Sequence, residues 1–309
     1  MKKQQLLESR RNWLGRMLSS AGLATGLKGA GFSRPIGAEL YTVRMALPDA
    51  AETTIRAIAE IGYKEAEGDR ASLARLDPIL RQNGMRMTSC HLETPLITGN
   101  WEPWIKTRAA THTPFADSSM TMEAAIEAIA KAGVRFAVMA YVLPQERGGP
   151  EFYRRLAGKM NHAGKVAAAA GVQFCYHNHC YEFEGRTGER PFDILSEGLD
   201  KKLVMFELDV FWLSVAGQDP VEMIQKMSGR VPLLHLKDKA RGTPVLYREA
   251  AVHHDQFKEV GSGVLDFPAI LRAAEAAKVQ HYFVEQDYTP GNPVDSLRTS
   301  YRYLRSVKL

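Results

Sequence analysis

Histidine and carboxylate side chains recur at the ends of short apolar runs in this 309-residue chain. The sets are Glu67; His91 and Glu93; His177-Asn178-His179; Glu207 and Asp209; His235-Leu236-Lys237-Asp238; and Glu285 and Asp287. Imidazoles and carboxylates are the side chains that hold divalent transition metals in proteins. A single histidine in such a place is more often a hydrogen-bonded structural residue. The prediction of a divalent-metal site therefore depends on these ends converging in the fold.

A spacing of two residues places both members of a pair on one face of a strand, because side chains alternate. The pairs with this spacing include Glu207 with Asp209 and His235 with Lys237. Phe206 and Leu208 are then expected to pack outward, against helices. His177 and His179 share a face only if their strand stays regular, since a bulge would exchange them. Both histidines therefore remain candidate ligands.

Short β-like runs alternate with amphipathic helical patterns from residue 37 onward. The expected strands are Ala38–Val43, Tyr63–Glu67, Met85–His91, Arg135–Ala140, Val172–His177, Leu203–Asp209, Val231–Lys237 and Gln280–Gln286. The expected helices are Ala50–Ile61, Ser72–Asn83, Met120–Ala132, Pro150–Ala170, Pro191–Gly198, Pro220–Ser228, Pro268–Lys278 and Ser296–Arg305. This alternation predicts a single-domain (β/α)8 TIM barrel over residues 37–307, whose strand ends meet at one mouth. An open doubly wound sheet is the rival fold, but no G-x-G-x-x-G follows the first strand.

Two long connections, Leu92–Ser119 and Asp238–Gly263, follow strands and are therefore expected on the catalytic face of the barrel. The first contains Trp101, Trp104 and His112. Trp101 and Trp104 are candidates for stacking on the apolar face of a sugar ring.

Five motifs in order give the chain a resemblance to a known family. They are Tyr176-His177-Asn178-His179 with Glu182-Phe183; Glu207-Leu208-Asp209-Val210-Phe211-Trp212; His235-Leu236-Lys237-Asp238; Gly261-Ser262-Gly263 with Asp266-Phe267; and Phe283-Val284-Glu285. On these residues the chain resembles the xylose isomerase-like TIM-barrel superfamily of sugar isomerases and epimerases, which also contains AP endonuclease-type barrels. The resemblance covers residues 37–307 and implies a metal-dependent sugar enzyme.

The resemblance also implies one divalent ion, Mn, Zn, Co or Mg, held by one residue from each of strands five to eight, typically Glu, Asp, His and Glu. Asp209, His235 and Glu285 match the last three positions. His177 stands at the first position, where the family commonly has the Glu that also acts as a base. A neutral imidazole can hold a metal, but once bound it is no longer a free base. This departure puts a two-carboxylate proton transfer in doubt.

An ion at this place would polarise a ketose carbonyl and favour an enediolate. Glu285 is a candidate base as well as a ligand, and Lys237 is a candidate for holding an oxyanion or a sugar hydroxyl. The other candidate bases are His179, Glu182 and His91. The candidate substrate contacts are His91, Trp212, Trp101 and Trp104. The glycines of Gly261-Ser262-Gly263 either offer amides to a phosphate or form an ordinary loop turn.

The leading interpretation is an isomerase or epimerase acting on a ketose or keto-sugar. A lyase or dehydratase acting on a keto-sugar or keto-inositol uses the same enolate, and the histidine at position 177 favours it. An exported sugar-binding barrel without catalysis is the non-enzyme alternative. An endonuclease is disfavoured, since six basic residues against one acidic residue in 1–33 account for the whole net charge of +5. The rest of the chain carries no net charge and no basic stripe, so no nucleic-acid partner is expected.

Residues 1–33 read as an export signal. Ser9-Arg10-Arg11-Asn12-Trp13-Leu14 precedes a weakly apolar stretch from Met17 to Leu27 and resembles a twin-arginine leader. We therefore expect a bacterial periplasmic or otherwise exported protein that engages the twin-arginine export machinery, with cleavage near Ala30 or Ser33. An amphipathic N-terminal helix with a chance Arg-Arg is the alternative. No apolar run is long enough for a stable membrane anchor.

The three cysteines, Cys90, Cys175 and Cys180, are odd in number and form no C-x-x-C motif. Cys90 and Cys175 fall in strand-like runs, so buried free thiols are expected.

Overall fold

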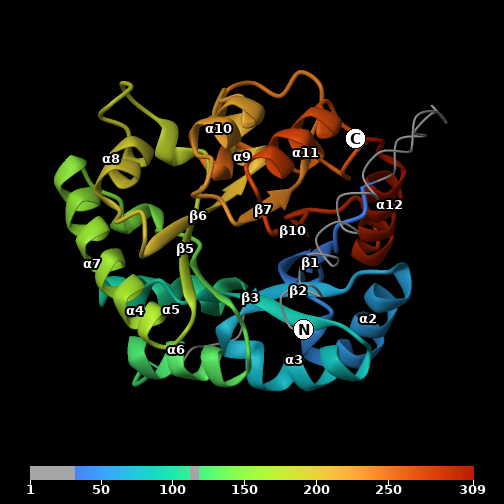
Figure 1. Cartoon of the computed structure of the whole chain (residues 1–309), viewed down its shortest axis with the longest axis horizontal. Coiled ribbons are helices and arrows are strands. Elements are labelled where there is room, and N and C mark those ends of the chain that lie inside the picture. The colour runs from blue at the N-terminus through green and yellow to red at the C-terminus, as the bar shows by residue number, and fades with distance from the viewer. Residues whose placement is uncertain (1–31, 112–117) are drawn as a thin grey trace, which may run out of the picture. The chain divides into compact units, whose positions relative to one another are not determined.

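The computed structural model describes residues 32–111 and 118–309. Within these ranges eight parallel strands close into one barrel with helices around it (Figure 1). The expected single-domain TIM barrel is therefore confirmed. Except for Phe32 and Ser33, the expected export segment lies outside the described residues, as does His112.

Every barrel strand overlaps one of the expected strands. They are β1 (Gly37–Glu39), β2 (Glu65–Asp69), β3 (Arg86–Leu92), β4 (Phe136–Met139), β5 (Gln173–His177), β6 (Val204–Asp209), β7 (Leu233–Leu236) and β10 (His281–Val284). The barrel closes where β10 pairs with β1 and Phe283 lies opposite Gly37. A Cβ on Gly37 would lie 2.4 Å from Phe283 Cδ1, so only glycine allows this close approach.

Proline marks the start of several helices, because the first N–H of a helix has no partner within it. The helices are α2 (Leu47–Ile61), α3 (Arg70–Gln82), α4 (Pro95–Thr98), α5 (Trp101–Thr111), α6 (Met122–Lys131), α7 (Pro150–Ala169), α8 (Pro191–Gly198), α9 (Val210–Val215), α10 (Pro220–Lys226), α11 (Phe267–Ala276) and α12 (Pro293–Ser306). The short 3-10 turns are η1 (Leu40–Val43), η2 (Pro144–Glu146), η3 (Tyr181–Phe183), η4 (Glu249–Ala251) and η5 (His254–Gln256).

The first strand is shorter than the predicted Ala38–Val43. It ends at Glu39, whose side-chain Oε2 accepts the N–H of Leu40 at 2.7 Å. This bond caps the turn η1 and ends the strand locally. As a result, Glu39 lies at the carboxyl end of β1.

The two long connections contain more regular structure than expected. Leu92–Ser119 includes α4 and α5. Sequence periodicity missed α5 because its residues lack a clear apolar stripe. Asp238–Gly263 includes the strands β8 (Asp238–Lys239) and β9 (Phe257–Lys258), which pair antiparallel.

Apolar side chains fill the barrel below its mouth. The inner cluster consists of Phe136, Val138, Cys175, Leu233 and Phe283. Phe206 and Leu208 belong instead to the larger cluster between strands and helices, as the alternation predicted. All three cysteines are buried free thiols, which confirms that expectation. No helix in the described part of the chain is long and apolar enough to cross a membrane.

The fold includes Phe32, which is 2% exposed. Its N–H donates to the Val307 carbonyl at 2.9 Å, and its ring meets Tyr282 edge-on at 5.0 Å between centroids. The two ends of the described chain are therefore joined at the barrel.

Candidate functional site

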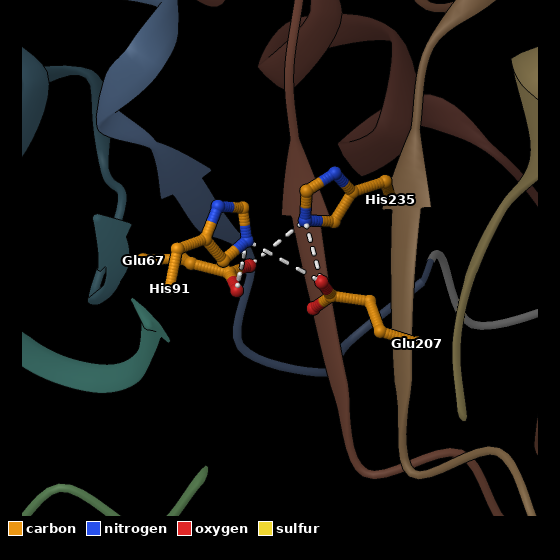
Figure 2. A group of neighbouring side chains, drawn as sticks. All are labelled: Glu67, His91, Glu207 and His235. Carbon is orange, nitrogen blue, oxygen red and sulfur yellow. Dashed lines mark hydrogen bonds and ion pairs between the residues drawn. The ribbon is translucent and has the colours of Figure 1, made fainter. Parts of the chain in front are cut away.

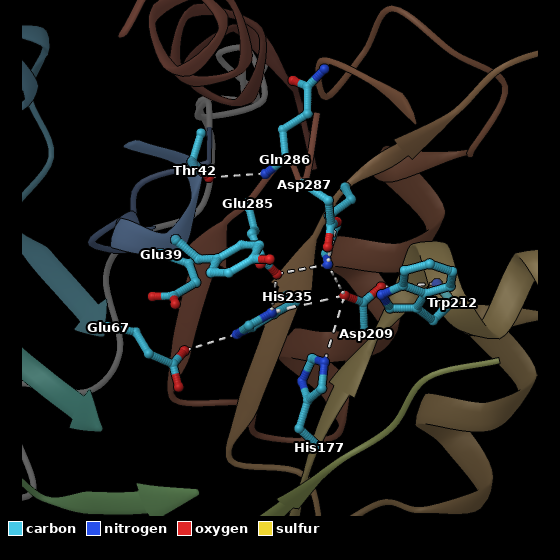
Figure 3. Close-up of polar contacts among 12 residues, drawn as sticks. Glu39, Thr42, Glu67, His177, Asp209, Trp212, His235, Glu285, Gln286 and Asp287 are labelled. Atoms are coloured by element: carbon cyan, nitrogen blue, oxygen red, sulfur yellow. Dashed lines mark hydrogen bonds and ion pairs between the residues drawn. The ribbon is translucent and has the colours of Figure 1, made fainter. Parts of the chain in front are cut away.

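The carboxyl ends of β5, β6 and β7 bring His177, Asp209 and His235 together at the barrel mouth (Figure 3). Asp209 Oδ2 lies 4.0 Å from His177 Nε2 and 3.8 Å from His235 Nδ1. One ligand atom from each residue lies within 4.8 Å of the others, and all three residues are buried. We call these three residues the mouth cluster.

Asp209 is held so that one oxygen faces the two imidazoles. Its Oδ1 accepts the N–H of Trp212 at 2.9 Å at the start of α9, and its own N–H donates to Asn178 Oδ1 at 3.1 Å. Oδ2 is buried and accepts no hydrogen bond of normal geometry. Burial raises the pKa of Asp209 to about 6, against the lowering effect of Lys237 and His235. A buried carboxylate oxygen left over beside two imidazoles is suited to ligate a cation.

Lys237 and Glu285 lie beside the mouth cluster. Glu285 Oε2 lies 2.8 Å from His235 Nδ1 and 2.7 Å from Lys237 Nζ. The same Nζ lies 3.0 Å from Asp209 Oδ2 and 2.9 Å from Asp287 Oδ2. Burial lowers the pKa of Lys237, but the three carboxylates outweigh it and raise the pKa well above its usual range. Lys237 is therefore a buried, charged residue of the site rather than a solvated one.

Three of the four predicted ligands, His177, Asp209 and His235, form a group that could hold a divalent ion, and the fourth, Glu285, lies next to this group. Two imidazoles and two carboxylates form a donor set typical of Zn, Mn or Co sites. Burial and the neighbouring His235 lower the pKa of His177 to about 3, so its ring is neutral and has a lone pair for a metal. Glu285 joins the mouth cluster through its contact with His235.

A second group consists of the buried Glu67, Glu207 and His235, which lie below the mouth, and the partly exposed His91, which also lines a cavity above the mouth cluster (Figure 2). His91 Nε2 lies 2.8 Å from Glu67 Oε1, and His235 Nε2 lies 2.8 Å from Glu67 Oε2. Glu207 Oε2 lies 3.5 Å and 3.3 Å from the same two nitrogens. Burial lowers the pKa of both rings, but the two glutamates outweigh it and raise the pKa of each well above its usual range. His235 therefore belongs to both groups, with one ring nitrogen in each.

A cavity of about 360 Å³ opens above the mouth cluster. Its lining includes the predicted catalytic and substrate-contact residues Glu285, His179, Lys237, His91, Trp104 and Trp212. Trp104 and Thr107 come from α5 and Glu249 and Phe257 from the later connection, so both long connections lie on this face, as expected. The predicted contact Trp101 is not among the described residues that line the cavity.

His177 and His179 have different environments. Strand β5 ends at His177, so His179 has already left the strand. The His179 ring packs against Tyr141 at 4.9 Å and Trp212 at 5.3 Å between centroids. Burial lowers the pKa of His179 well below its usual value and keeps the ring neutral. The structure thus places His177 in the mouth cluster and His179 in the cavity wall.

Glu182, another candidate base, uses both oxygens elsewhere. Its Oε1 accepts the Tyr176 hydroxyl at 2.6 Å and its Oε2 accepts the N–H of His179 at 2.9 Å. It is fully buried and is not part of the cavity lining that the structure describes. Its contacts hold the turn that carries His179.

The Gly261-Ser262-Gly263 loop does not present its amides to the cavity. The N–H groups of Gly261 and Gly263 donate to Asp238 Oδ2 at 3.0 and 2.8 Å, and that of Leu265 donates to Oδ1 at 3.0 Å. A Cβ on Gly263 would lie 2.3 Å from the Lys239 carbonyl oxygen, so the close approach requires glycine. The segment is a loop turn tied down by Asp238.

Several lining residues were missed in the sequence. They are Glu39, Tyr41, Asp69, Tyr141, Glu249 and Tyr288. Glu39 lies at the carboxyl end of its strand, as the other candidate residues do. It was missed only because its strand was expected to continue to Val43. Burial raises the pKa of Glu39 well above its usual value, which favours its neutral form. Tyr288 and Glu249 lie in connections, where periodicity gives no signal.

A family model described as the xylose isomerase-like TIM barrel matches residues 55–307. The chain is 31% identical over 158 residues to an inosose dehydratase from Geobacillus thermodenitrificans, covering 48% of this chain and 52% of that protein. It is 27% identical over 174 residues to an inosose dehydratase from Clostridium perfringens, covering 53% and 56% respectively. The chain thus spans about half the length of the curated relatives it matches.

Solved structures share the fold. A sugar phosphate isomerase/epimerase from Parabacteroides distasonis has a TM-score of 0.68 at 22% identity, over 93% of this chain and 98% of that one. A 3-keto-D-glucoside 4-epimerase from E. coli has a TM-score of 0.61 at 17% identity, over 89% and 100%. A xylose isomerase-like barrel from Mycobacterium smegmatis, solved in complex with magnesium, has a TM-score of 0.64 at 13% identity, over 90% and 97%. Because the family model matches most of the barrel, the chain belongs to the xylose isomerase-like TIM barrel family.

Proposed function

We propose that this chain is a divalent-metal-dependent enzyme that removes a proton beside the carbonyl of a neutral ketose or keto-sugar. The observation that carries the proposal is the mouth cluster, whose buried Asp209 Oδ2 faces two imidazoles and the Lys237 ammonium below a cavity of about 360 Å³. Isomerisation or epimerisation through an enediolate is the leading reaction.

A divalent ion held by His177, Asp209, His235 and Glu285 supplies Lewis-acid polarisation of a carbonyl and its neighbouring hydroxyl. Lys237 lines the cavity as a charged ammonium and can donate to an oxygen that becomes negative as the proton leaves.

Two carboxylates beside Lys237 are available as the base. Burial raises the pKa of Glu285, but Lys237 and His235 outweigh it and hold the pKa well below its usual value. Burial raises the pKa of Asp287, and Lys237 offsets only part of this effect. A general base works best with a pKa near the working pH, so Asp287 joins the predicted Glu285 as a candidate.

The charges around the cavity favour a substrate without phosphate. The described lining carries five acidic side chains, Glu39, Asp69, Glu249, Glu285 and Asp287, of which Glu39 favours its neutral form. Its one lysine or arginine among the described residues is Lys237, which already lies within 3.0 Å of three carboxylates. Carboxylates accept hydrogen bonds from sugar hydroxyls but repel a phosphate. A neutral polyhydroxylated ring is therefore the substrate class we propose.

Dehydration of a keto-sugar or keto-inositol is the second candidate. Burial and the neighbouring His235 lower the pKa of His177 to about 3, so position 177 has no effective base. Removing one proton and expelling a β-hydroxyl needs fewer bases than exchanging protons between two positions. The identity to inosose dehydratases supports the same choice.

The test is to incubate the metal-loaded protein with neutral ketoses, keto-sugars and keto-inositols in D₂O and to follow the products by NMR. Deuterium at the α-carbon with a new stereoisomer or aldose supports isomerisation or epimerisation. Loss of water with a new conjugated double bond supports dehydration. Phosphorylated analogues are expected to react at least about tenfold more slowly. Sugar binding that persists after chelation, without exchange or turnover, would instead support the sugar-binding alternative.

We also propose that residues 1–31 direct export through the twin-arginine route, on the basis of Arg10-Arg11 and the apolar stretch after them. Because Phe32 packs in the barrel, cleavage is expected before it. A double Arg10→Lys, Arg11→Lys variant should keep the protein in the cytoplasm, as fractionation and N-terminal sequencing would show. Unchanged export of this variant would overturn the proposal.

A further inference from the structure

Each histidine of the mouth cluster has one ring nitrogen facing Asp209 and the other facing a deeper glutamate. Figure 3 shows both rings beside Asp209, and Figure 2 shows His235 beside Glu67 and Glu207. His235 Nδ1 lies 3.8 Å from Asp209 Oδ2 and 2.8 Å from Glu285 Oε2, while its Nε2 makes a 2.8 Å hydrogen bond with Glu67 Oε2. His177 Nε2 lies 4.0 Å from the same Oδ2, while its Nδ1 lies 3.2 Å from Glu207 Oε2. The nitrogen that faces Asp209 is therefore Nδ1 in His235 and Nε2 in His177.

A neutral imidazole has one N–H and one lone pair, and a carboxylate attracts the N–H. We propose that Glu67 and Glu207 are positioning residues that fix the tautomers of His235 and His177, and thereby turn both lone pairs toward Asp209. A carboxylate behind a metal-binding histidine orients the ring and makes its lone pair more basic. The inference rests on the proposed metal site and assigns these two carboxylates a role in building it.

The two glutamates are joined into one layer by His91. Its Nε2 lies 2.8 Å from Glu67 Oε1 and 3.5 Å from Glu207 Oε2, and its ring stacks on His235 at 5.9 Å between centroids. Ser89 Oγ donates to Glu67 Oε1 at 2.9 Å. Glu67 and Glu207 are both 0% exposed, so water does not compete for them. The layer holds its two carboxylates at fixed places below the ligands.

The group of Glu67, His91, Glu207 and His235 also has the composition of a second metal site. His235 is shared by both groups, however, and a neutral ring offers one lone pair only. Both ring nitrogens lie 2.8 Å from a carboxylate, Nε2 from Glu67 and Nδ1 from Glu285. Because Glu285 is itself a predicted ligand, an ion at the mouth would take the Nδ1 lone pair and leave the proton on Nε2, facing Glu67. An ion in the deep layer is the contrary outcome of the test.

Glu65 provides a matched control on the same strand, two residues before Glu67. It is 1% exposed, and its Oε2 bonds with His281 Nδ1 at 2.7 Å. This pair is also a buried carboxylate with a histidine, but it contacts none of the mouth cluster. Replacing Glu65 by Gln therefore measures the cost of disturbing such a pair apart from any effect on metal binding.

The experiment compares Glu67→Gln, Glu207→Gln and Glu65→Gln in the full chain, with Zn²⁺ and Co²⁺ affinities measured by chelator competition and folding checked by circular dichroism. We expect affinity to fall about 10- to 100-fold in Glu67→Gln and Glu207→Gln and less than about 3-fold in Glu65→Gln. Two variants acting through different histidines keep the test valid if one of them does not fold.

Ring ¹⁵N NMR of the Zn²⁺-loaded protein reports which nitrogen of each histidine carries the proton. If the two glutamates had a merely structural role, replacing them would leave this unchanged. We expect the His235 proton on Nε2 and the His177 proton on Nδ1. Glu67→Gln should disturb His235 and leave His177 unchanged, whereas Glu207→Gln should disturb His177, with a smaller effect on His235, whose Nε2 lies 3.3 Å from Glu207 Oε2. Affinity that falls equally in all three variants, or tautomers that do not change, overturns the positioning role. Two ions per wild-type chain, with one lost in Glu67→Gln, overturns it in favour of a deep ion. A wild-type chain that binds no divalent ion overturns both this inference and the proposed function.

Discussion

The two ends of the barrel both hold buried histidine–glutamate pairs, but they use them differently. At the amino end, Glu65 accepts from His281 at 2.7 Å and from Arg86 at 2.7 Å, and both of its oxygens are bonded. Burial raises the pKa of Glu65, but these two hydrogen bonds outweigh it and lower the pKa. At the mouth, Asp209 Oδ2 accepts no hydrogen bond of normal geometry, although the Lys237 ammonium lies 3.0 Å from it.

The difference shows that a buried ionisable pair does not by itself mark a functional site. At the amino end both Glu65 oxygens are bonded, and His281 Nε2 is the atom of this pair that has no partner. At the mouth, a buried carboxylate oxygen that could ligate a metal accepts no hydrogen bond of normal geometry, and a cavity lies beside it. Left-over buried atoms cost stability unless a ligand completes them, so those that lie beside a cavity support the proposed metal site.

Asp209→Asn gives the largest expected effect and tests the mouth. Zinc sites with four ligands bind with about 10–16 kcal/mol, so one ligand accounts for on the order of 3–4 kcal/mol, or about 10²- to 10³-fold in affinity. Unfolding free energy should change by less than about 1 kcal/mol, because the amide oxygen can still cap α9 through Trp212. Chelator competition and urea unfolding check the two parts. Unchanged metal affinity would contradict the comparison.

Glu65→Ala tests the amino end and should lower the unfolding free energy while leaving the metal affinity nearly unchanged. Removing one partner of a buried pair costs about 3 kcal/mol of unfolding free energy, because His281 is left without its carboxylate. Metal affinity of the folded variant should stay within about 3-fold of the wild type. A loss of more than tenfold in metal affinity would remove the distinction between the two ends.

Glu182→Gln tests whether burial and a raised pKa suffice to make a catalytic group. Burial raises the pKa of Glu182 from 4.5 to about 7, so the folded state binds more protons than the unfolded state between these values. Wild-type stability should therefore fall relative to the variant as pH rises from about 4.5 to about 7, by about 2–3 kcal/mol in all. Urea unfolding across this range checks the slope. Lost metal binding or turnover would place Glu182 in the site instead.

The two tryptophans of α5 give the smallest expected effect. Trp104 lines the cavity and Trp101 is not part of the described lining. Trp104→Leu should raise the KM for a turned-over sugar about 2- to 10-fold, from a loss of about 0.5–1.5 kcal/mol of aromatic contact. Trp101→Leu should change the KM by less than about 2-fold. Equal effects would show that the cavity wall extends further along α5.

The alternation of strands and helices was sufficient to predict the barrel and the meeting of its polar strand ends at one mouth. The choice of His177, Asp209 and His235 among those residues came from the family resemblance, and alternation left His177 and His179 as alternatives. Alternation could not predict that Glu39 ends its own strand by capping η1, since this depends on one side-chain bond. It also could not predict that Lys237 turns toward three carboxylates, one of them Asp287 beyond the end of β10.

Contacts between connections were beyond sequence reasoning for a different reason. Arg147 pairs with Glu249 across 102 positions, at 2.6 and 3.1 Å, and brings Glu249 to the cavity. Neither residue belongs to a periodic pattern, and irregular segments meet only because the barrel places them together. The ligand candidates were therefore predictable, whereas most of the cavity wall was not.

Asp238 fastens the long connection that follows β7. Its two oxygens gather the amides of Gly261, Gly263 and Leu265, so the connection that starts at Lys239 is fastened at both ends close to β7. The span between these ends can change in length or be grafted from another barrel without shifting His235. Evolution, or a protein engineer, can thus alter what enters the cavity while the chemistry beneath it stays in place.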